Sequence, residues 1–326
     1  MDLQWNDGAS EARFSAYVEG LSTCLGHADR VAPFRSYCTG LLLPGDRKSV
    51  EPMAARRRPD RTSAAHQSLL HFVGQSPWDE KALRRAVRAA VMTQRLPIEA
   101  WIVDDTGLPK KGRHSVGVGR QYCGQLGKQD NCQVAVSLSV ATSEASLPVA
   151  WQLYLPDAWA QDPERRRKAK VPDAIEFQSK PEIALAQIAS AVAENITPGV
   201  VLADAGYGNS SAFRDGLAAL GLEFVVGISA TATVWLPGTA PVVPAATGRG
   251  RRPKNLRRGG DDAPVAQVGT LVKSLAGDAW QTVTWREGAA EALTSRFAAR
   301  RFARYTRMHY EDFVADPAAG LREIEI

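Results

Sequence analysis

The sequence predicts an α/β fold in which a mixed sheet, with three antiparallel strands followed by parallel strands, is flanked by helices and preceded by a helical region. Two observations predict it. Residues 99–155 contain short apolar runs and a strictly alternating segment, which are patterns of strands. Residues 183–228 instead read as helix, apolar strand, helix and strand, so that they end in a β-α-β unit.

The chain has 326 residues, of which 44% are hydrophobic, and can bury a sizeable core. It contains no uninterrupted apolar run of about 18 residues, as a membrane span would need. Residues 1–10 are acidic and polar, where a secretory signal would be basic and then apolar. We therefore expect a soluble, cytoplasmic protein with no membrane partner.

The four cysteines never show Cys-x-x-Cys spacing and the five histidines show no paired ligand spacing, so a structural zinc site is not expected. The formal charge of +5 and the pI near 9.1 are modest evidence for a polyanionic partner. The location of the basic residues is more informative than their number.

The first hundred residues read as helices separated by proline and glycine. The clearest helix starts at Ser76, which can act as its cap, with Pro77 at the first helical position. Its apolar residues recur at helical spacing, namely Leu83, Val87 and Val91. Its opposite face carries Lys81, Arg84, Arg85 and Arg88. That face is either a solvated outer surface or a helix that contacts phosphates.

Three strands are predicted next. Trp101–Asp105 is a short apolar run that ends in two acids, and 133–141 alternates strictly between apolar and other residues. Residues 147–155 follow closely enough to pair with 133–141 as a hairpin. The three segments predict consecutive antiparallel strands.

A helix is predicted through Ile183 and Val192, followed by the apolar strand 200–203. Asp204 ends that strand. A glycine turn, a helix capped by Ser210 or Ser211, and the strand 224–228 then follow. Chemistry in open α/β sheets lies just beyond the carboxyl end of a strand, which is the predicted position of Asp204.

Asp105 and Asp204 each end an apolar run, where an unpaired carboxylate is costly to bury. Asp204 can simply cap the following helix or turn, and Asp105 with Thr106 and Gly107 can form an ordinary turn. Taken together, two aspartates on neighbouring strands repel each other unless they are protonated or bridged by a cation. Oxygen ligands of this type suit Mg²⁺ or Mn²⁺, and a pair of such ions supports phosphodiester cleavage.

Two blocks of sequence resemble the DDE transposases of insertion sequences. The first block runs from Asp104 to Gly112 and continues through Gly117, 120–122, 124–127 and 131–133; the second is Ala203-Asp204-Ala205-Gly206-Tyr207-Gly208. The resemblance covers most of the chain up to about Ala299. It implies an RNase H-like fold and a family activity of magnesium-dependent DNA cleavage and strand transfer.

By position, the resemblance implies that Asp105 is the first catalytic and metal-binding aspartate and that Asp204 is the second. Asp104 is the alternative for the first position. On a strand, Asp104 and Asp105 point to opposite faces, so only one of them is expected to face the metals. The partners implied are double-stranded DNA at transposon ends and target DNA, with a homodimer expected on the DNA.

Basic residues that are candidates for DNA contacts lie in two segments, and a third basic cluster, 165–170, reads as a surface loop. Lys110, Lys111, Arg113 and Arg120 lie among glycines, in a loop whose backbone can approach phosphates closely. Arg251, Arg252, Arg257 and Arg258 belong to a later basic run. A flexible surface hairpin is the alternative for the first segment, and a solvated loop is the alternative for the second.

The third acid of the family, a glutamate on a later helix, is not found in the sequence. Residues 301–326 resemble a fragment of a sulfotransferase instead, and Glu311 is the candidate replacement acid. We therefore expect an incomplete copy of a transposase. The alternatives are a non-catalytic DNA-binding remnant and, more remotely, a sulfotransferase.

The expected organisation has four parts. They are a helical DNA-binding region at 1–97, the first part of the catalytic core at 98–230, a partly basic and flexible insertion at 231–300, and a tail outside the family pattern at 301–326.

Overall fold

The computed structural model describes residues 8–45, 47–236, 265–287, 291–305 and 321–325. The chain forms two compact units, Met1–Leu202 and Ala203–Ile326. Among the described residues, no helix is long and apolar enough to cross a membrane. Short 3₁₀ helices accompany the main elements: η1 Thr23–Leu25, η2 Ala28–Arg30, η3 Pro59–Arg61, η4 Gly124–Leu126 and η5 Gly277–Ala279.

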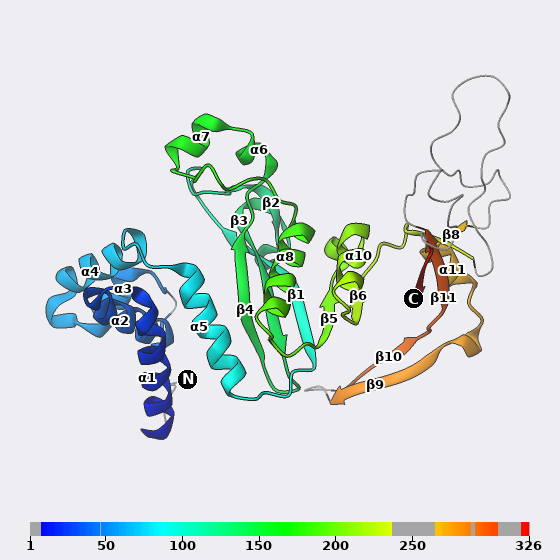
Figure 1. The fold of residues 1–326 in the computed structure, drawn as a ribbon, viewed down its shortest axis with the longest axis horizontal. Coiled ribbons are helices and arrows are strands. Elements are labelled where there is room, and N and C mark those ends of the chain that lie inside the picture. The colour runs from blue at the N-terminus through cyan, green and yellow to red at the C-terminus, as the bar shows by residue number, and fades with distance from the viewer. Residues whose placement is uncertain (1–7, 46, 237–264, 288–290, 306–320, 326) are drawn as a thin grey trace. The chain divides into compact units, whose positions relative to one another are not determined.

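The first unit begins with four helices (Figure 1). They are α1 Gly8–Ser22, α2 Val31–Leu42, α3 Val50–Arg57 and α4 Thr62–Gly74. Apolar side chains from α1, α2 and α4 share one core, whose buried members are Val18, Leu21, Leu25, Phe34 and Phe72. The Phe72 ring stacks on Trp78 with centroids 6.1 Å apart. The predicted helical N-terminal region is confirmed.

Helix α5, Glu80–Thr93, lies between these helices and the sheet (Figure 1). Leu83 and Val87 pack against the N-terminal core. On its other side, Arg88 is 4% exposed, and its Nε donates at 2.9 Å to the carbonyl of Val149 on strand β4, Ser146–Leu153. Neither sequence alternative for the basic face describes Arg88, because its guanidinium packs on the sheet and finds partners there.

Four strands of the first unit pair around β3, which is one of them. They are β1 Ala100–Pro109, β2 Gly119–Cys123, β3 Lys128–Ala141 and β4 Ser146–Leu153. Strand β3 pairs antiparallel with each of the other three. Its buried side chains alternate along the strand as the sequence predicts: Val134, Val136, Leu138 and Val140. Strand β2 was not predicted, because the glycines around it read as a loop.

Beyond β4, the first unit contains two short helices, a long helix and a strand. They are α6 Asp157–Ala160, α7 Pro163–Lys168, α8 Lys180–Ala193 and β5 Val200–Ala203. Helix α8 packs on β3, where the Gln187 side chain donates to the carbonyl of Val136 at 3.0 Å. A capping box formed by Ser179 and Glu182 starts α8. Within this unit the strand order of the sheet is β2-β3-β1-β5, with β4 paired to β3.

The second unit starts with α9 Ala205–Gly208, α10 Ser211–Ala219 and β6 Phe224–Val226. The Ser210 hydroxyl accepts from the Phe213 backbone N–H and caps α10, whose buried side chains are Phe213 and Leu217. Gly221, with φ of 69°, follows the end of α10, as glycine commonly does. The mixed sheet flanked by helices confirms the predicted fold class.

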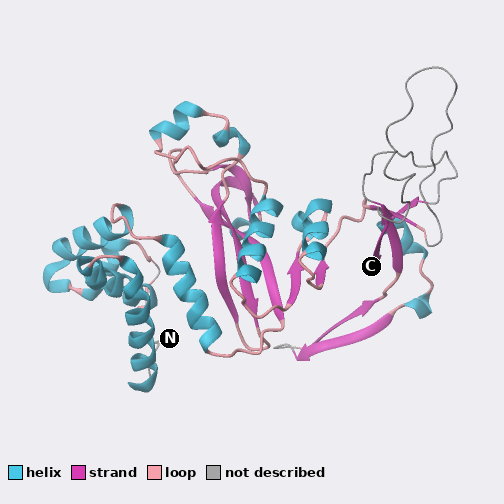
Figure 2. Cartoon of the chain, viewed as in Figure 1, coloured by secondary structure: helices cyan, strands magenta, loops and turns pink. Residues whose placement is uncertain are grey.

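The rest of the second unit is rich in strands (Figure 2). It contains β7 Thr233–Trp235, β8 Val265–Gln267, α11 Val268–Ser274, β9 Gln281–Glu287, β10 Ala292–Phe297, β11 Arg301–Tyr305 and β12 Leu321–Glu325. Strands β9 and β10 form an antiparallel pair, and the other four form a sheet of order β12-β11-β7-β8. Ala303 pairs with Trp235, so the described start of the predicted tail forms a sheet with the predicted insertion.

Candidate active site

Asp105 lies in the middle of β1, opposite Val136 of β3. Trp101 and Val103 precede it at two-residue spacing and are 0% and 2% exposed, so Asp105 lies on the face of β1 that enters the core. Its side chain is 22% exposed. The strand was expected to end at the acids, but pairing with β3 extends it to Pro109.

Asp104 lies on the other face of the same strand and is exposed. Its Oδ1 accepts a hydrogen bond from the backbone N–H of Asp105 at 2.7 Å. Its carbonyl accepts from the Ser137 hydroxyl at 3.3 Å. The two acids therefore project to opposite sides of β1, and only Asp105 lies on the core side.

Lys180 is the ionic partner of Asp105. Its Nζ lies 2.5 Å from Asp105 Oδ2, and the lysine side chain is 30% exposed. Lys180 is the first residue of α8, where the positive end of the helix dipole disfavours a cation. The Asp105 carboxylate offsets that unfavourable position. Sequence reasoning missed Lys180, and the available signal was its position in the first turn of a helix, which is unfavourable for a cation.

Tyr154 and Cys132 also lie near Lys180. The ring centroid of Tyr154 lies 5.8 Å from its Nζ. Burial raises the pKa of the Tyr154 hydroxyl, and the charge of Asp157 raises it further. Burial also raises the pKa of the Cys132 thiol, with a smaller contribution from the adjacent Cys123. Because Cys132 stays protonated at neutral pH, it is a poor nucleophile and a poor metal ligand.

Asp204 follows β5 and caps α9. Its Oδ1 accepts from the backbone N–H of Gly206 at 2.8 Å, and its side chain is exposed. Gly208 allows the close approach of α9 to the segment after β6, since a Cβ at this position would lie 2.0 Å from the carbonyl oxygen of Gly227. The capping alternative for Asp204 therefore describes its local bonds, and it leaves a metal-binding role open.

The side chains of Asp105 and Asp204 each fit a divalent cation in the type of their donor atoms, because carboxylate oxygens are preferred ligands of Mg²⁺ and Mn²⁺. Within the ranges that the structure describes, no three His, Cys, Asp or Glu residues come together as a metal site. Glu311, the candidate third acid, lies outside the described residues. Among the described residues, the candidate metal ligands are thus Asp105, which pairs with Lys180, and Asp204.

The predicted DNA-binding residues of the first segment lie on β2 and in the loop after β1, whose backbone is fixed by hydrogen bonds. Asn131 donates from Nδ2 to the carbonyls of Lys110 and Gly112, at 2.6 and 2.9 Å. Lys111 and Arg113 are exposed in this loop, and Arg120 is exposed on β2. Because Asn131 fixes the loop backbone, the alternative of a loose hairpin does not describe residues 110–112. Arg251, Arg252, Arg257 and Arg258 lie outside the described residues.

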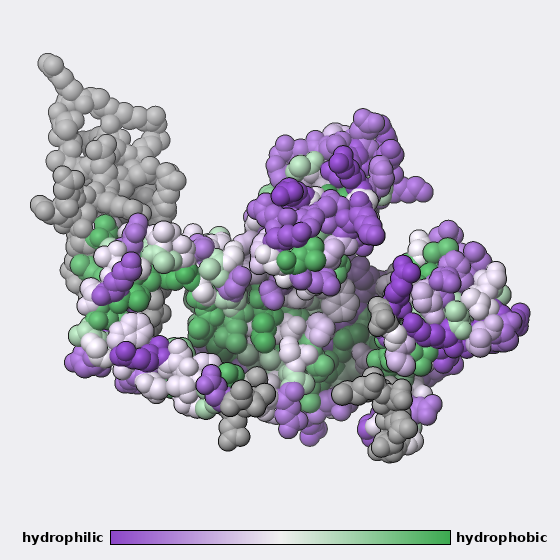
Figure 3. Space-filling model, turned by 180° about the vertical axis from the view of Figure 1, so that it is seen from behind, coloured by the Kyte–Doolittle hydropathy of each residue, from purple (hydrophilic) through white to green (hydrophobic). Residues whose placement is uncertain are grey.

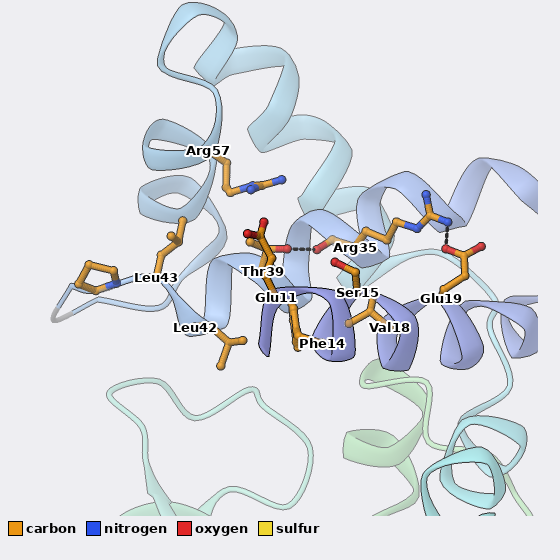
Figure 4. A pocket seen from close by; sticks show the side chains of 11 residues that line it. Glu11, Phe14, Ser15, Val18, Glu19, Arg35, Thr39, Leu42, Leu43 and Arg57 are labelled. Atoms are coloured by element: carbon orange, nitrogen blue, oxygen red, sulfur yellow. Dashed lines mark hydrogen bonds and ion pairs between the residues drawn. The ribbon is translucent and has the colours of Figure 1, made fainter. Parts of the chain in front are cut away.

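The first unit also contains a pocket of about 660 Å³, formed by α1, α2 and adjoining residues (Figure 4). Its wall mixes apolar side chains such as Phe14 and Leu42 with charged ones, including the ion pair of Arg35 and Glu19. None of the predicted site residues lines it. The pocket belongs to the N-terminal helices and is separate from the candidate site.

Two comparisons with known proteins agree with each other. Over 166 residues, the chain is 36% identical to a protein from Microchaete diplosiphon described as "Probable transposase for insertion sequence element IS701". The aligned part covers 50% of this chain and spans 40% of the length of that relative.

The model of a protein family described as DDE superfamily endonuclease matches residues 20–292, a range that contains both Asp105 and Asp204. The resemblance of the tail to a sulfotransferase is not borne out. The mixed sheet and its flanking helices have the RNase H-like arrangement that this family implies. Because the match covers most of the chain, the chain belongs to the DDE superfamily endonucleases.

Proposed function

We propose that this chain is an insertion-sequence transposase that cleaves DNA with Mg²⁺ or Mn²⁺ held by Asp105 and Asp204. Membership of the family supports this, together with the order of the strands. Asp105 lies on β1, Asp204 directly follows β5, and these strands are neighbours in the sheet. Two carboxylates on neighbouring strands repel each other unless they are protonated or a cation compensates them, and Lys180 supplies one such cation at Asp105.

When bound, a pair of divalent ions activates a water or a DNA 3′-hydroxyl and stabilises the leaving oxygen. The protein's own residues supply the framework. Pairing of β1 with β3 holds the backbone of Asp105, and the bond from Gly206 restricts rotation of the Asp204 carboxylate. The Lys180 ammonium lowers the net negative charge at Asp105, so that a DNA phosphate is repelled less on approach.

Nicking of a supercoiled plasmid that carries the terminal inverted repeats tests the proposal. Because the third acid of the family is not found in the sequence, any nicking by the wild type is expected to be slow, to need Mg²⁺ or Mn²⁺ and to stop in EDTA. Asp105→Asn and Asp204→Asn keep the size of the side chain but lose the charge, and each is expected to reduce the rate at least about 100-fold. Asp104→Asn is the matched control, because Asp104 lies on the opposite face of β1 and is expected to retain activity.

The same assay separates the two functions that the sequence left open. If the wild type binds the repeats but nicks in neither metal, the chain is a DNA-binding protein without nuclease activity. If Asp104→Asn is inactive and Asp105→Asn is active, Asp104 is the metal ligand.

The proposed partners are double-stranded DNA at the transposon ends and at the target, bound by two copies of the chain. Lys110, Lys111, Arg113 and Arg120 are proposed to contact the DNA backbone. Mass photometry on a fragment with one transposon end tests the stoichiometry. A complex with one protein chain at saturation contradicts the homodimer.

A further inference from the structure

The segment between β4 and α8 packs against the loop that follows β1. Val118 from the loop is 1% exposed, and it shares a small core with Leu155 and Trp159, which are 6% and 1% exposed. The indole Nε1 of Trp159 donates to the carbonyl of Val118 at 2.7 Å. Two segments about 40 residues apart in the sequence are therefore joined by burial and by a hydrogen bond.

Two arginines of the basic run 165–170 strengthen this packing. The guanidinium of Arg165 lies 3.7 Å from the ring centroid of Trp159, and its Nη2 donates to the carbonyls of Arg113 and Val118 at 3.2 and 3.3 Å. Arg166 donates to the carbonyls of Pro172 and Ile175 at 3.1 and 2.7 Å. Both arginines are half-buried, so their main role is to hold the segment together.

The remaining cations of both segments face solvent. Arg167, Lys168 and Lys170 are exposed at the C-terminal end of α7, and Lys111 and Arg113 are exposed in the loop. Because Arg165 bonds to the backbone of Arg113, the two groups of cations belong to one part of the surface. Figure 3 shows hydrophilic residues covering this end of the first unit.

The acidic residues of the segment are placed differently. Asp157 is held by the side-chain amide of Gln161, and Asp162 caps α7 by accepting from the Arg165 backbone N–H at 2.9 Å. Glu164 lies in the first turn of α7, and Asp173 and Glu176 lie in the return to α8. Although the segment carries both signs of charge, the cations are concentrated at the end of α7 and in the loop.

We infer that Lys111 and Arg113 of the loop and Arg167, Lys168 and Lys170 of the α7 region form one surface that binds the phosphates of double-stranded DNA. The inference rests on the proposed function and extends the DNA contact to a second, sequence-distant segment. Cations that neutralise phosphates release counterions, which drives binding without reading the base sequence.

The inference is tested by measuring DNA binding of the full chain with fluorescence anisotropy in EDTA. The salt concentration is varied between about 50 and 200 mM, the range over which such slopes are resolved. The first variant is Arg167→Gln with Lys168→Gln, and the second is Lys111→Gln with Arg113→Gln. Each double variant is expected to bind on the order of tenfold more weakly and to lower the slope of log K against log salt by about 2. The quadruple variant is expected to lower the slope by about 4.

The matched control is Lys128→Gln with Lys273→Gln, which removes the same charge from exposed positions outside the surface. It is expected to leave the slope unchanged. Thermal unfolding of every variant is expected to match the wild type, because all the substituted side chains are exposed.

If the wild type binds DNA and the Arg167/Lys168 variant keeps the wild-type slope, the inference is wrong and the proposed function stands. An equal loss in the control also overturns it, because total charge would then explain the effect. If the wild type does not bind DNA in EDTA or with metal, both the inference and the proposed DNA partner are wrong.

Discussion

The guanidinium of Arg88 lies 2.6 Å from the carboxylate of Glu194, and the two side chains are 5% and 33% exposed. Arg88 also donates to the Ser190 hydroxyl at 3.1 Å and to the carbonyl of Val149. One side chain of α5 thus bonds to β4, to α8 and to the residue that follows α8. Because α5 also packs on the N-terminal helices, this arginine couples that region to the sheet.

Arg88→Met removes the charge but keeps an apolar stem of similar length. The substitution leaves the Glu194 carboxylate with its bond from Ser190 but without a cation, and it removes the Arg88 donor from the Val149 carbonyl. The free energy of unfolding is expected to fall by about 2 kcal/mol, less than for a fully buried pair, because Glu194 is partly exposed. Urea denaturation measures the loss. Lys81→Met, at an exposed position of the same helix, is expected to stay within about 0.5 kcal/mol of the wild type.

The same pair predicts a dependence of stability on pH. Burial raises the pKa of Glu194, but the bond and charge of Arg88 and the bond from Ser190 outweigh this and hold it below the ordinary value of 4.5. The folded carboxylate binds protons less readily than the unfolded one, so its contribution is complete above pH 4.5 and falls as the pH drops through the folded pKa.

Urea denaturation of the wild type and of Glu194→Gln at several pH values tests this. The difference in free energy of unfolding between them is expected to be constant above the ordinary pKa and to shrink in more acidic solution. A difference that grows on acidification contradicts the lowered pKa.

Lys180→Met tests the ion pair at Asp105. Without the ammonium, no cation competes with a divalent ion for the carboxylate, so Mn²⁺ is expected to raise the unfolding temperature more than it does in the wild type. In EDTA the variant is expected to be destabilised by about 1 kcal/mol, because a half-buried carboxylate loses its partner. Differential scanning fluorimetry with and without Mn²⁺ measures both effects.

Lys168→Met serves as the control for Lys180→Met, since Lys168 is exposed and bonds to no site residue. If Mn²⁺ raises the unfolding temperature of Lys180→Met only as much as that of the wild type, the lysine and the metal do not compete for Asp105. Adding Asp105→Asn to Lys180→Met is expected to abolish the enhanced response.

Gly208→Ala places a methyl group 2.0 Å from the carbonyl oxygen of Gly227 and 2.9 Å from Val226 Cβ. Backbone must move to relieve this contact, which shifts α9 and the capping residue Asp204. The expected loss in free energy of unfolding is about 3 kcal/mol. Gly277→Ala is the control, because its methyl group meets no atom within 4 Å. Equal urea midpoints for the two variants contradict the close approach.

Local patterns were sufficient for several elements. The alternation of Val134, Val136 and Leu138 predicted β3, because one face of a half-buried strand must be apolar. The apolar run 200–203 and the serine before α10 predicted the strand and helix on either side of Asp204. The opposite faces of Asp104 and Asp105 follow from the two-residue period of a strand alone.

Other features depend on which segments meet in space. Strand β2 lies among glycines, which weaken the local strand pattern, and its pairing with β3 provides the hydrogen bonds that the pattern lacks. The arginine face of α5 had the composition of a solvated surface, and only its contacts with β4 and α8 make Arg88 a buried residue.

Short-range periodicity and compact motifs were enough to predict the fold class and the family, and they made Asp105 and Asp204 the candidate metal ligands. The tertiary structure was needed to show that the Lys180 ammonium pairs with the Asp105 carboxylate, 75 residues away in the sequence, and that α7 bonds to the loop after β1. The physical reason is that ion pairs and shared cores depend on three-dimensional proximity, and the spacing of residues along the chain carries no signal for contacts between segments so far apart.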